Sequence, residues 1–384
     1  MNPYIRYLGK DVLMSAVRRN CPATVKLLIS ERINPNLKDR CGNTAISLAS
    51  NGEYTSILKI LINAKADLNL QNRDKDTALI TASHKGNIEM TELLINAGAN
   101  LNLQDKCGNS ALIIASYKGN TKIIKLLIDA GANLNLQDKY GNSALIVASH
   151  QGHTETVKLL IDAGANLNLQ DCREYTAIMS AHLEKNTEIV KLLISAGANL
   201  NLKNEDDVDF IHLASSRGYV DIFEFLIKSK NKLNLRNDWK ENALIVASLR
   251  NQENTVKFLI KSKTNLNFKN EDGRTAVMLA SWKGHKNIVK LLIDEGADLN
   301  LEDNNRETAL MLASLEGREN IVKLLIDPET NLNLRNKHGA AALILAFREG
   351  HKEIIKLLID GGADLSLLDD GKTDAPWQKI MSRL

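Results

Sequence analysis

A repeat of 33 residues constrains the fold of this chain more than any other feature of its sequence. The stretch from Gln104 to Ile113 returns from Gln137 to Ile146 with one substitution, and the period holds without insertion or deletion from Ile5 to Leu367. Repeats of this length stack so that neighbours bury one continuous core. We therefore predict one array of repeated units in place of the two or three globular domains that the length alone suggests.

Each unit begins with a turn and a first helix. In the unit 104–136, Asp105 to Gly108 have turn chemistry, because Asp bonds its own backbone and Gly tolerates positive φ. Ser110 is typical of a helix N-cap, so we expect the first helix over 111–117. Capping residues are also expected at the equivalent positions Thr44, Thr77, Ser143, Thr176, Asp209, Asn242, Thr275 and Thr308.

A second helix and a finger complete the unit. Gly119 ends the first helix, and a wide apolar face predicts the second helix over 121–130. Gly131 follows as the left-handed residue that closes this helix. The alternation of Asn and Leu over 133–136 favours a short extended finger that leads to the next turn.

Composition and charge exclude several classes of protein. The 49 basic and 46 acidic residues give a net charge of +3, too small and too dispersed for a general phosphate-binding surface, so we expect no nucleic-acid partner. The N-terminus has no apolar run suited to a signal peptide, and no segment approaches ~18 uninterrupted apolar residues. We therefore expect no membrane association and an intracellular, cytoplasmic monomer, located in the host cytoplasm if the source is a pathogen.

The residue types that support catalysis or metal binding are not arranged for either. Cys41 and Cys107 lie two units apart, roughly 16–20 Å at a helix spacing of ~8–10 Å, whereas a disulfide requires Cα atoms within about 7 Å. His84 and His150 are also two units apart, too far to share one zinc ion. No H-E-x-x-H, G-x-S-x-G or G-x-G-x-x-G motif occurs. We expect no enzymatic activity, no cofactor and no metal site.

The repeat resembles the ankyrin repeat. That family has a turn, a helix start similar to Thr-Pro-Leu-His, and a second helix that ends in Gly-Ala-Asp before the finger. The matching stretches here run from Asp272 to Val277 and from Leu291 to Asn300, although the family's proline is Ala in most units. The richness in Ile, Lys and Asn looks like that of ankyrin proteins from parasites, large viruses or intracellular bacteria.

The resemblance implies an all-α fold, an ankyrin-repeat solenoid of paired antiparallel helices with short β-hairpin-like fingers. It also implies three parts along the chain. We expect an N-terminal capping repeat over 1–37, ten repeats of 33 residues over 38–367, and a C-terminal capping half-repeat over 368–384.

The resemblance further implies where a partner binds, because ankyrin partners contact the finger tips and the exposed end of the first helix. Residues vary at these positions, and an exposed aromatic ring in an aliphatic array is the usual form of a binding anchor. The alternative is that each ring covers the core of the adjacent repeat. The candidate partner-binding residues are Arg40, Arg73, Tyr117, Tyr140, Leu183, Trp239, Leu249, Trp282 and Leu315.

We interpret the chain as a non-enzymatic protein–protein interaction scaffold that binds a partner protein on its concave, finger-lined face. One alternative is a substrate-recruiting adaptor for a ubiquitin ligase or another enzyme complex, although we find no appended C-terminal box of the kind such adaptors carry. Another alternative is a structural spacer, which predicts no localised anchor patch. The sequence does not identify the partner, because the fold serves many unrelated ones.

A modification hypothesis concerns four finger asparagines. Asn102, Asn135, Asn168 and Asn201 each follow a Leu eight residues earlier. They look like the asparagine that an animal asparaginyl hydroxylase modifies in ankyrin repeats. The alternative is that these side chains form hydrogen bonds that join successive fingers.

Residues 203–268 depart most from the repeat. Left-handed positions without Gly cost about 1 kcal/mol each, and the stability of a solenoid is a sum of local terms. We therefore predict that this segment is the weakest part of the array and a hinge between two stiffer halves. The departures are Asp207 and Lys240 at the turn Gly, Lys230 and Lys263 at the helix-ending Gly, and His212 in place of Ile or Met.

Overall fold

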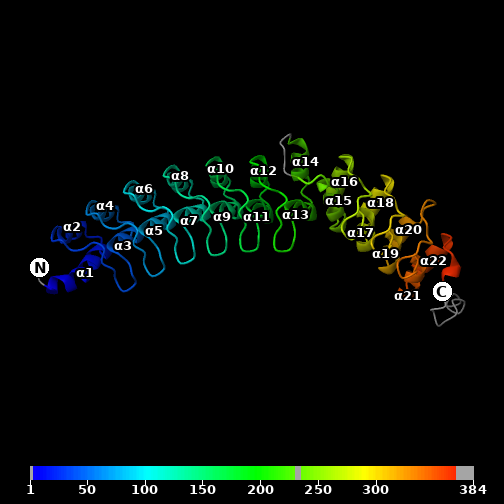
Figure 1. Ribbon diagram of the computed structural model, residues 1–384, viewed down its shortest axis with the longest axis horizontal. Helices are drawn as coiled ribbons and strands as arrows, with labels where there is room; N and C mark the ends of the chain where they lie inside the picture. Colours follow the sequence, from blue (N-terminus) through cyan, green and yellow to red (C-terminus); the bar gives the residue numbers. More distant parts are fainter. Residues whose placement is uncertain (1–2, 230–234, 369–384) are drawn as a thin grey trace. The chain divides into compact units, whose positions relative to one another are not determined.

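The computed structural model describes residues 3–229 and 235–368. The chain divides into two compact units, with the boundary between Val208 and Asp209. Both units consist of helix pairs joined by turns and loops (Figure 1). Lys230 and nearly all of the half-repeat expected at 368–384 lie outside the described residues.

The first unit places its first helices in one row and its second helices in another (Figure 1). Helices of each row pack on the next member of the same row and on their own partner. Each repeat therefore contributes to a core shared with both neighbours. The first helices are α1 (Pro3–Arg18), α3 (Ala45–Asn51), α5 (Ala78–Lys85), α7 (Ala111–Lys118), α9 (Ala144–Gln151) and α11 (Ala177–Leu183). The second helices are α2 (Pro22–Ser30), α4 (Thr55–Asn63), α6 (Ile88–Asn96), α8 (Thr121–Asp129), α10 (Thr154–Asp162) and α12 (Thr187–Ser195).

The second unit repeats this arrangement. Its first helices are α13 (Phe210–Arg217), α15 (Trp239–Leu249), α17 (Ala276–Lys283), α19 (Ala309–Leu315) and α21 (Ala342–Glu349). Its second helices are α14 (Val220–Lys228), α16 (Glu253–Lys261), α18 (Lys286–Asp294), α20 (Glu319–Leu325) and α22 (Lys352–Asp360), followed by the 3-10 helix η1 (Leu365–Leu368).

The core follows the apolar pattern of the repeat. Leu112 and Ile113 of α7 are buried, as are Ile123, Ile124 and Leu127 of α8. Two apolar faces that meet in this way contribute most of the stability of a helix pair too short to be stable alone. The helix lengths and pairing confirm the all-α fold that the repeat predicts.

Polar side chains cap the first helices as expected, with two exceptions. The Oγ atom of Ser110 accepts a hydrogen bond from the Ile113 amide, and Thr44, Thr77, Ser143, Thr176, Asp209 and Thr308 cap their helices in the same way. The Thr275 hydroxyl has no hydrogen-bond partner, and the Met278 sulfur accepts a hydrogen bond from the Thr275 amide. The expected cap Asn242 is wrong, since it lies inside α15.

The start of α15 explains that error. Lys240 occupies the place of the turn Gly, and the helix begins at Trp239, three residues before the expected cap. The preceding residue, Asp238, makes no side-chain capping bond. Lys75, Glu174, Asp207 and Arg306 are left-handed at the same repeat position, whereas Lys240 is helical, so the chain forms no finger turn here.

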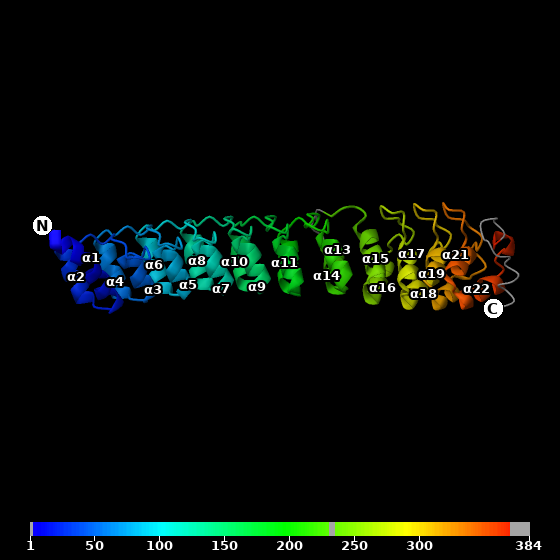
Figure 2. The same ribbon diagram turned by 90° about the horizontal axis from the view of Figure 1, so that it is seen from below.

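Asparagine side chains link successive fingers. The Oδ1 atom of Asn102 accepts from the Asn133 amide at 2.8 Å, and Asn135 and Asn168 make the equivalent bonds to the next fingers. The expected extended stretch 133–136 contains a turn at Leu134–Asn135, which brings these oxygens to the neighbouring backbone. The finger loops of the first unit accordingly lie in a row along one edge (Figure 2).

The next finger approaches closely at turn glycines such as Gly108, although Lys75, Glu174, Asp207 and Arg306 hold the same left-handed position in other repeats. Gly108 has φ 84°, and a Cβ atom there would lie 2.7 Å from the Lys139 amide nitrogen. The helix-ending Gly131 has φ 83°, yet its surroundings are open, so only its backbone conformation favours glycine.

Candidate binding groove

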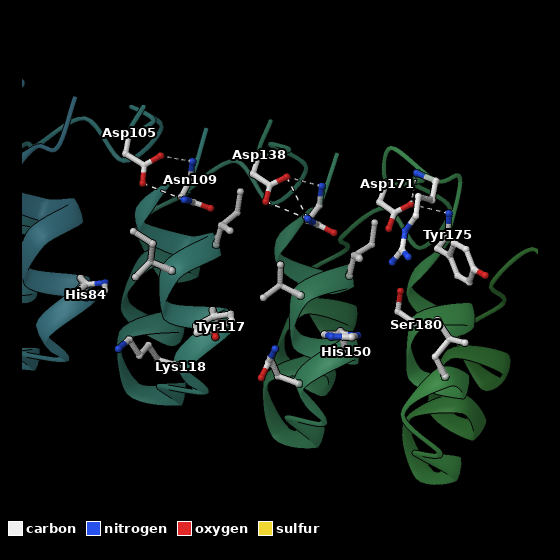
Figure 3. A pocket seen from close by; sticks show the side chains of 18 residues that line it. His84, Asp105, Asn109, Tyr117, Lys118, Asp138, His150, Asp171, Tyr175 and Ser180 are labelled. Carbon is white, nitrogen blue, oxygen red and sulfur yellow. Dashed lines mark hydrogen bonds between the residues drawn. The ribbon is translucent and has the colours of Figure 1, made fainter. Parts of the chain in front are cut away.

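A groove of about 540 Å³ crosses the first helices of the first unit (Figure 3). Its floor consists of Ile113 and Ile114 of α7 and of Ile146 and Val147 of α9. Val147 is half-buried, whereas Ile113, Ile114 and Ile146 are at most 9% exposed and form the base of the hollow. The groove thus offers apolar area together with the polar groups of two flanking rows.

One row lies on the first helices, one side chain per repeat. His84, Tyr117 and His150 follow one another on α5, α7 and α9 (Figure 3), and Leu183 occupies the same repeat position on α11. Tyr117 is the most exposed large hydrophobic residue in the groove, at 57%. His150 Nδ1 lies 3.6 Å from a carboxylate oxygen of Glu184, so this imidazole is partly engaged within the chain.

The other row consists of aspartates at the base of the fingers. Asp105, Asp138 and Asp171 stand opposite the first row, again one per repeat (Figure 3). The Oδ1 atom of Asp105 accepts from the amides of Cys107 and Asn109 at 2.7 and 2.8 Å. These bonds close the turn, and the same bonds recur at the other two aspartates.

A second, more polar hollow of about 390 Å³ continues the groove toward α3 and shares His84, Asp105 and Ile114 with it. Asp76 lines this hollow. Burial raises the pKa of Asp76, the hydrogen bond from Asn72 lowers it, and the charge of Asp105 raises it further. The charge of Asp105 thus acts on Asp76 across this hollow.

The finger-tip residues predicted from the sequence lie outside the groove. Arg40 and Arg73 are exposed on tips of the first unit, and Tyr140 is 54% exposed. Lys139 Nζ lies 4.8 Å from the centre of the Tyr140 ring. A hydrogen bond with Tyr140, helped by the nearby Cys107, raises the pKa of Lys139.

Trp239, in the second unit, is engaged in packing. It stacks on the buried Phe223 with ring centres 6.1 Å apart and an interplanar angle of 8°. This arrangement favours the alternative interpretation, in which the ring covers the core of the adjacent repeat.

Trp282 is half-buried within a polar network. Its indole N–H donates to Glu316 at 3.1 Å, and Lys283 Nζ lies 3.7 Å from the ring centre. The Arg274 guanidinium lies 5.4 Å from the same centre. Leu249 and Leu315 are also half-buried, and their carbonyl oxygens lie 3.1 and 3.2 Å from histidine Nε2 atoms.

The predicted binding residues are thus divided between the two units, and the structure brings together only Tyr117 and Leu183 in the groove. The modification hypothesis for the finger asparagines stays a prediction. Asn102, Asn135 and Asn168 are exposed, and their oxygens form the finger links, while Asn201 is half-buried.

Sequence reasoning missed the aspartate row as part of a site, because each aspartate was assigned to turn formation. The signal was present in the repetition of Asp at 105, 138 and 171 beside a varying helix position. Within 3–229 and 235–368, no helix is long and apolar enough to cross a membrane. The same residues contain no group of three or more His, Cys, Asp or Glu side chains placed to hold a metal ion.

Comparisons with known proteins agree with the geometry. A family model described as "Ankyrin repeats (3 copies)" matches residues 13–105, 46–138, 87–171, 112–204, 211–303 and 295–369. The crystal structure of the ankyrin repeat domain of Bcl-3, described as a unique member of the IkappaB protein family, is similar with 26% identity and a TM-score of 0.52. That similarity covers 56% of this chain and 97% of the Bcl-3 chain. The search of curated proteins finds no match.

Ankyrin repeats are generally protein–protein interaction modules, and proteins built from them are typically non-enzymatic scaffolds. The matched stretches together span 13–204 and 211–369. The chain therefore belongs to the ankyrin-repeat family.

Proposed function

We propose that this chain is a non-enzymatic scaffold that binds a partner protein along the finger-lined groove of its first unit. The observation that carries the proposal is the exposed Tyr117 ring beside an apolar floor, in the same row as Leu183 two repeats further along. An aromatic side chain that is exposed beside a groove loses much of its contact with water when a partner covers it. A structural spacer, by contrast, would not require an exposed aromatic side chain beside an apolar groove.

Affinity capture from the native source tests this proposal. The wild-type chain and the double variant Tyr117→Ala with Leu183→Ala serve as baits, and bound proteins are identified and then measured with the purified chain. We expect the double variant to lose roughly thirty-fold in affinity, which is the effect of removing one strong anchor. Recovery of a ubiquitin-ligase subunit would assign the scaffold to the adaptor class.

Leu27→Ala is the matched control. Leu27 is 61% exposed on α2, a second helix, so its truncation removes a similar apolar side chain away from the groove. We expect this variant to bind the captured protein normally. If the control weakens binding as much as the groove variant, or if neither changes it, the groove is not the binding surface.

A further inference from the structure

We propose that the groove holds an extended basic segment of the partner, with one arginine or lysine side chain against each of Asp105, Asp138 and Asp171. This inference rests on the proposed function, because it names the chemistry of the partner for the same groove. It is argued from the aspartate row opposite Tyr117 (Figure 3).

The chain itself shows how this aspartate position holds a cation. In two other repeats, Asp39 Oδ2 lies 2.6 Å from Arg18 Nη2, and Asp303 Oδ2 lies 3.1 Å from Arg274 Nε. In both cases Oδ1 accepts the amides of the turn and Oδ2 contacts the guanidinium, and at Asp39 this Oδ2 also accepts the Asn43 side-chain amide at 3.3 Å. A carboxylate fixed by its own turn therefore binds arginine without any change in the fold.

The groove aspartates have the same turn geometry but lack the cation. Their Oδ1 atoms accept the same pair of turn amides. The Oδ2 atoms of Asp105 and Asp138 also accept the side-chain amides of Asn109 and Asn142 at 3.0 and 3.1 Å, as Asp39 Oδ2 does from Asn43 beside its arginine. Among the described residues, no lysine or arginine forms an ion pair with Asp105, Asp138 or Asp171. Arg173, which also lines the groove, lies over the Tyr175 ring at 5.3 Å. Three carboxylates in a row thus face a space that a cation from another molecule can occupy.

The spacing of the row selects the conformation of the bound segment. Packed helices are ~8–10 Å apart, so successive carboxylates recur at about that distance. A polyproline II segment has three residues per turn and rises about 3.1 Å per residue, so every third side chain recurs on one face after about 9 Å. In a β-strand, by contrast, every third side chain points to the opposite face. We therefore expect basic residues at every third position of a polyproline II segment.

The rest of the groove fits such a segment. The side chains between the basic residues face the apolar floor formed by Ile114 and Val147. The exposed Tyr117 ring offers a face to proline rings or to a guanidinium. Arginine suits the row better than lysine, because its planar fork binds a carboxylate through two donors.

Three labelled peptides probe the full chain by fluorescence anisotropy. The first contains four Arg-Pro-Pro triplets, the second has the same composition with the arginines grouped at one end, and the third contains Glu-Pro-Pro triplets. We expect the first peptide to bind most tightly and to lose affinity as salt is raised, because its contacts are partly exposed ion pairs. Equal binding of the first two peptides, or preference for the glutamate peptide, would overturn the inference.

The variant Asp105→Asn with Asp138→Asn removes the charge and keeps the turn. Asn72 and Asn270 occupy the same position in other repeats and accept the same turn amides at 2.8–3.1 Å. We expect affinity for the spaced peptide to fall about tenfold and its salt dependence to shrink. The matched control, Asp129→Asn with Asp162→Asn, removes two exposed charges from the ends of α8 and α10 and should leave binding unchanged.

The two proposals fail in different ways. If the captured protein depends on Tyr117 and Leu183 but binds the aspartate variant normally, the basic-segment inference is wrong and the scaffold function stands. If the spaced peptide binds in an aspartate-dependent way but the captured protein ignores all groove variants, the groove recognises basic peptides and the proposed scaffold surface is wrong.

Discussion

Single asparagine side chains connect neighbouring fingers in this array. Asn135 Oδ1 accepts the Asn166 amide at 2.8 Å, and that amide has no helical partner to replace it. Asn135→Ala should therefore lower the free energy of unfolding by about 1 kcal/mol, the usual net value of one hydrogen bond. Chemical denaturation followed by circular dichroism measures the change.

Asn96→Ala is the control for the finger variant, because Asn96 is exposed at the end of α6 and takes no part in a finger link. Its effect should stay within about 0.5 kcal/mol. Equal effects of the two substitutions would mean that the finger links add nothing to stability.

Trp239 is expected to support folding more than binding. Its ring stacks on the buried Phe223, so Trp239→Ala removes an aromatic pair and opens a gap above the core. We expect a loss of about 2 kcal/mol of stability, measured by denaturation, with Trp239→Phe close to wild type. Tyr117→Ala should change stability by less than about 0.5 kcal/mol. A stable Trp239→Ala variant that no longer binds the partner would restore Trp239 as an anchor.

At the scale of one helix, the residue that follows the second helix limits stability in one repeat of the second unit. Lys263 has φ 57° after α16, where Gly131 and Gly296 stand in other repeats. Because a Cβ atom at those glycines would meet nothing within 4 Å, only backbone strain separates Lys from Gly here. Lys263→Gly should raise stability by about 1 kcal/mol, and Gly131→Lys should lower it by a similar amount. No change in either variant would mean that the left-handed residue is not strained.

The histidine on α13 makes the second unit sensitive to acid. Burial of His212, helped by the charge of Arg250 and opposed by Asp209, lowers the pKa of its imidazole below the ordinary value of 6.5. Folding therefore favours the neutral ring, so stability is complete above the unfolded pKa and falls as pH drops below it. His212→Ile should remove this loss between about pH 7 and 5. Tryptophan fluorescence during denaturation at each pH measures the stability of the second unit, since Trp239 and Trp282 lie in that unit. An unchanged pH profile would contradict the assignment.

The sequence predicted most elements because each repeat carries its own start and stop signals. Ser110 and Gly119 bound α7 where the repeat placed its ends, to within one residue. The prediction from sequence failed at the start of α15. Whether Lys240 forms a turn or continues the helix upstream is not specified by the repeat pattern. The conformation of Leu134 and Asn135 was also missed, since a finger turn and an extended finger share the same alternation.

For the molecule as a whole, the 33-residue period was sufficient to predict the fold, whereas the groove required coordinates. The period identifies which positions face the fingers, but not which of them leave open space. Tyr117 and Leu183 line the groove, while Trp239 at another varying position packs inward. Such differences depend on the neighbouring side chain, which a repeat pattern does not specify.

Stability along the molecule should be lowest over residues 203–268. The boundary between the compact units lies within this segment, after Val208. Asp207 and Lys263 adopt positive φ at 61° and 57° without glycine, and α14, α15 and α16 have no side-chain N-caps. In residues 104–169, by contrast, side chains of Ser110, Asn120 and Ser143 cap α7, α8 and α9.

Each missing cap or strained residue costs about 1 kcal/mol, and the terms of a solenoid add locally, so opening should be easiest in this segment. Hydrogen–deuterium exchange with peptide resolution tests this on the unmodified chain. We expect helical amides of residues 203–268 to exchange at least tenfold faster than those of residues 104–169, which corresponds to a difference of about 1.4 kcal/mol in opening free energy. The Lys263→Gly variant should slow exchange in residues 203–268 and leave exchange in residues 104–169 unchanged. Equal exchange rates in the two segments would show that alternative helix ends absorb the departures and that the segment is not a hinge.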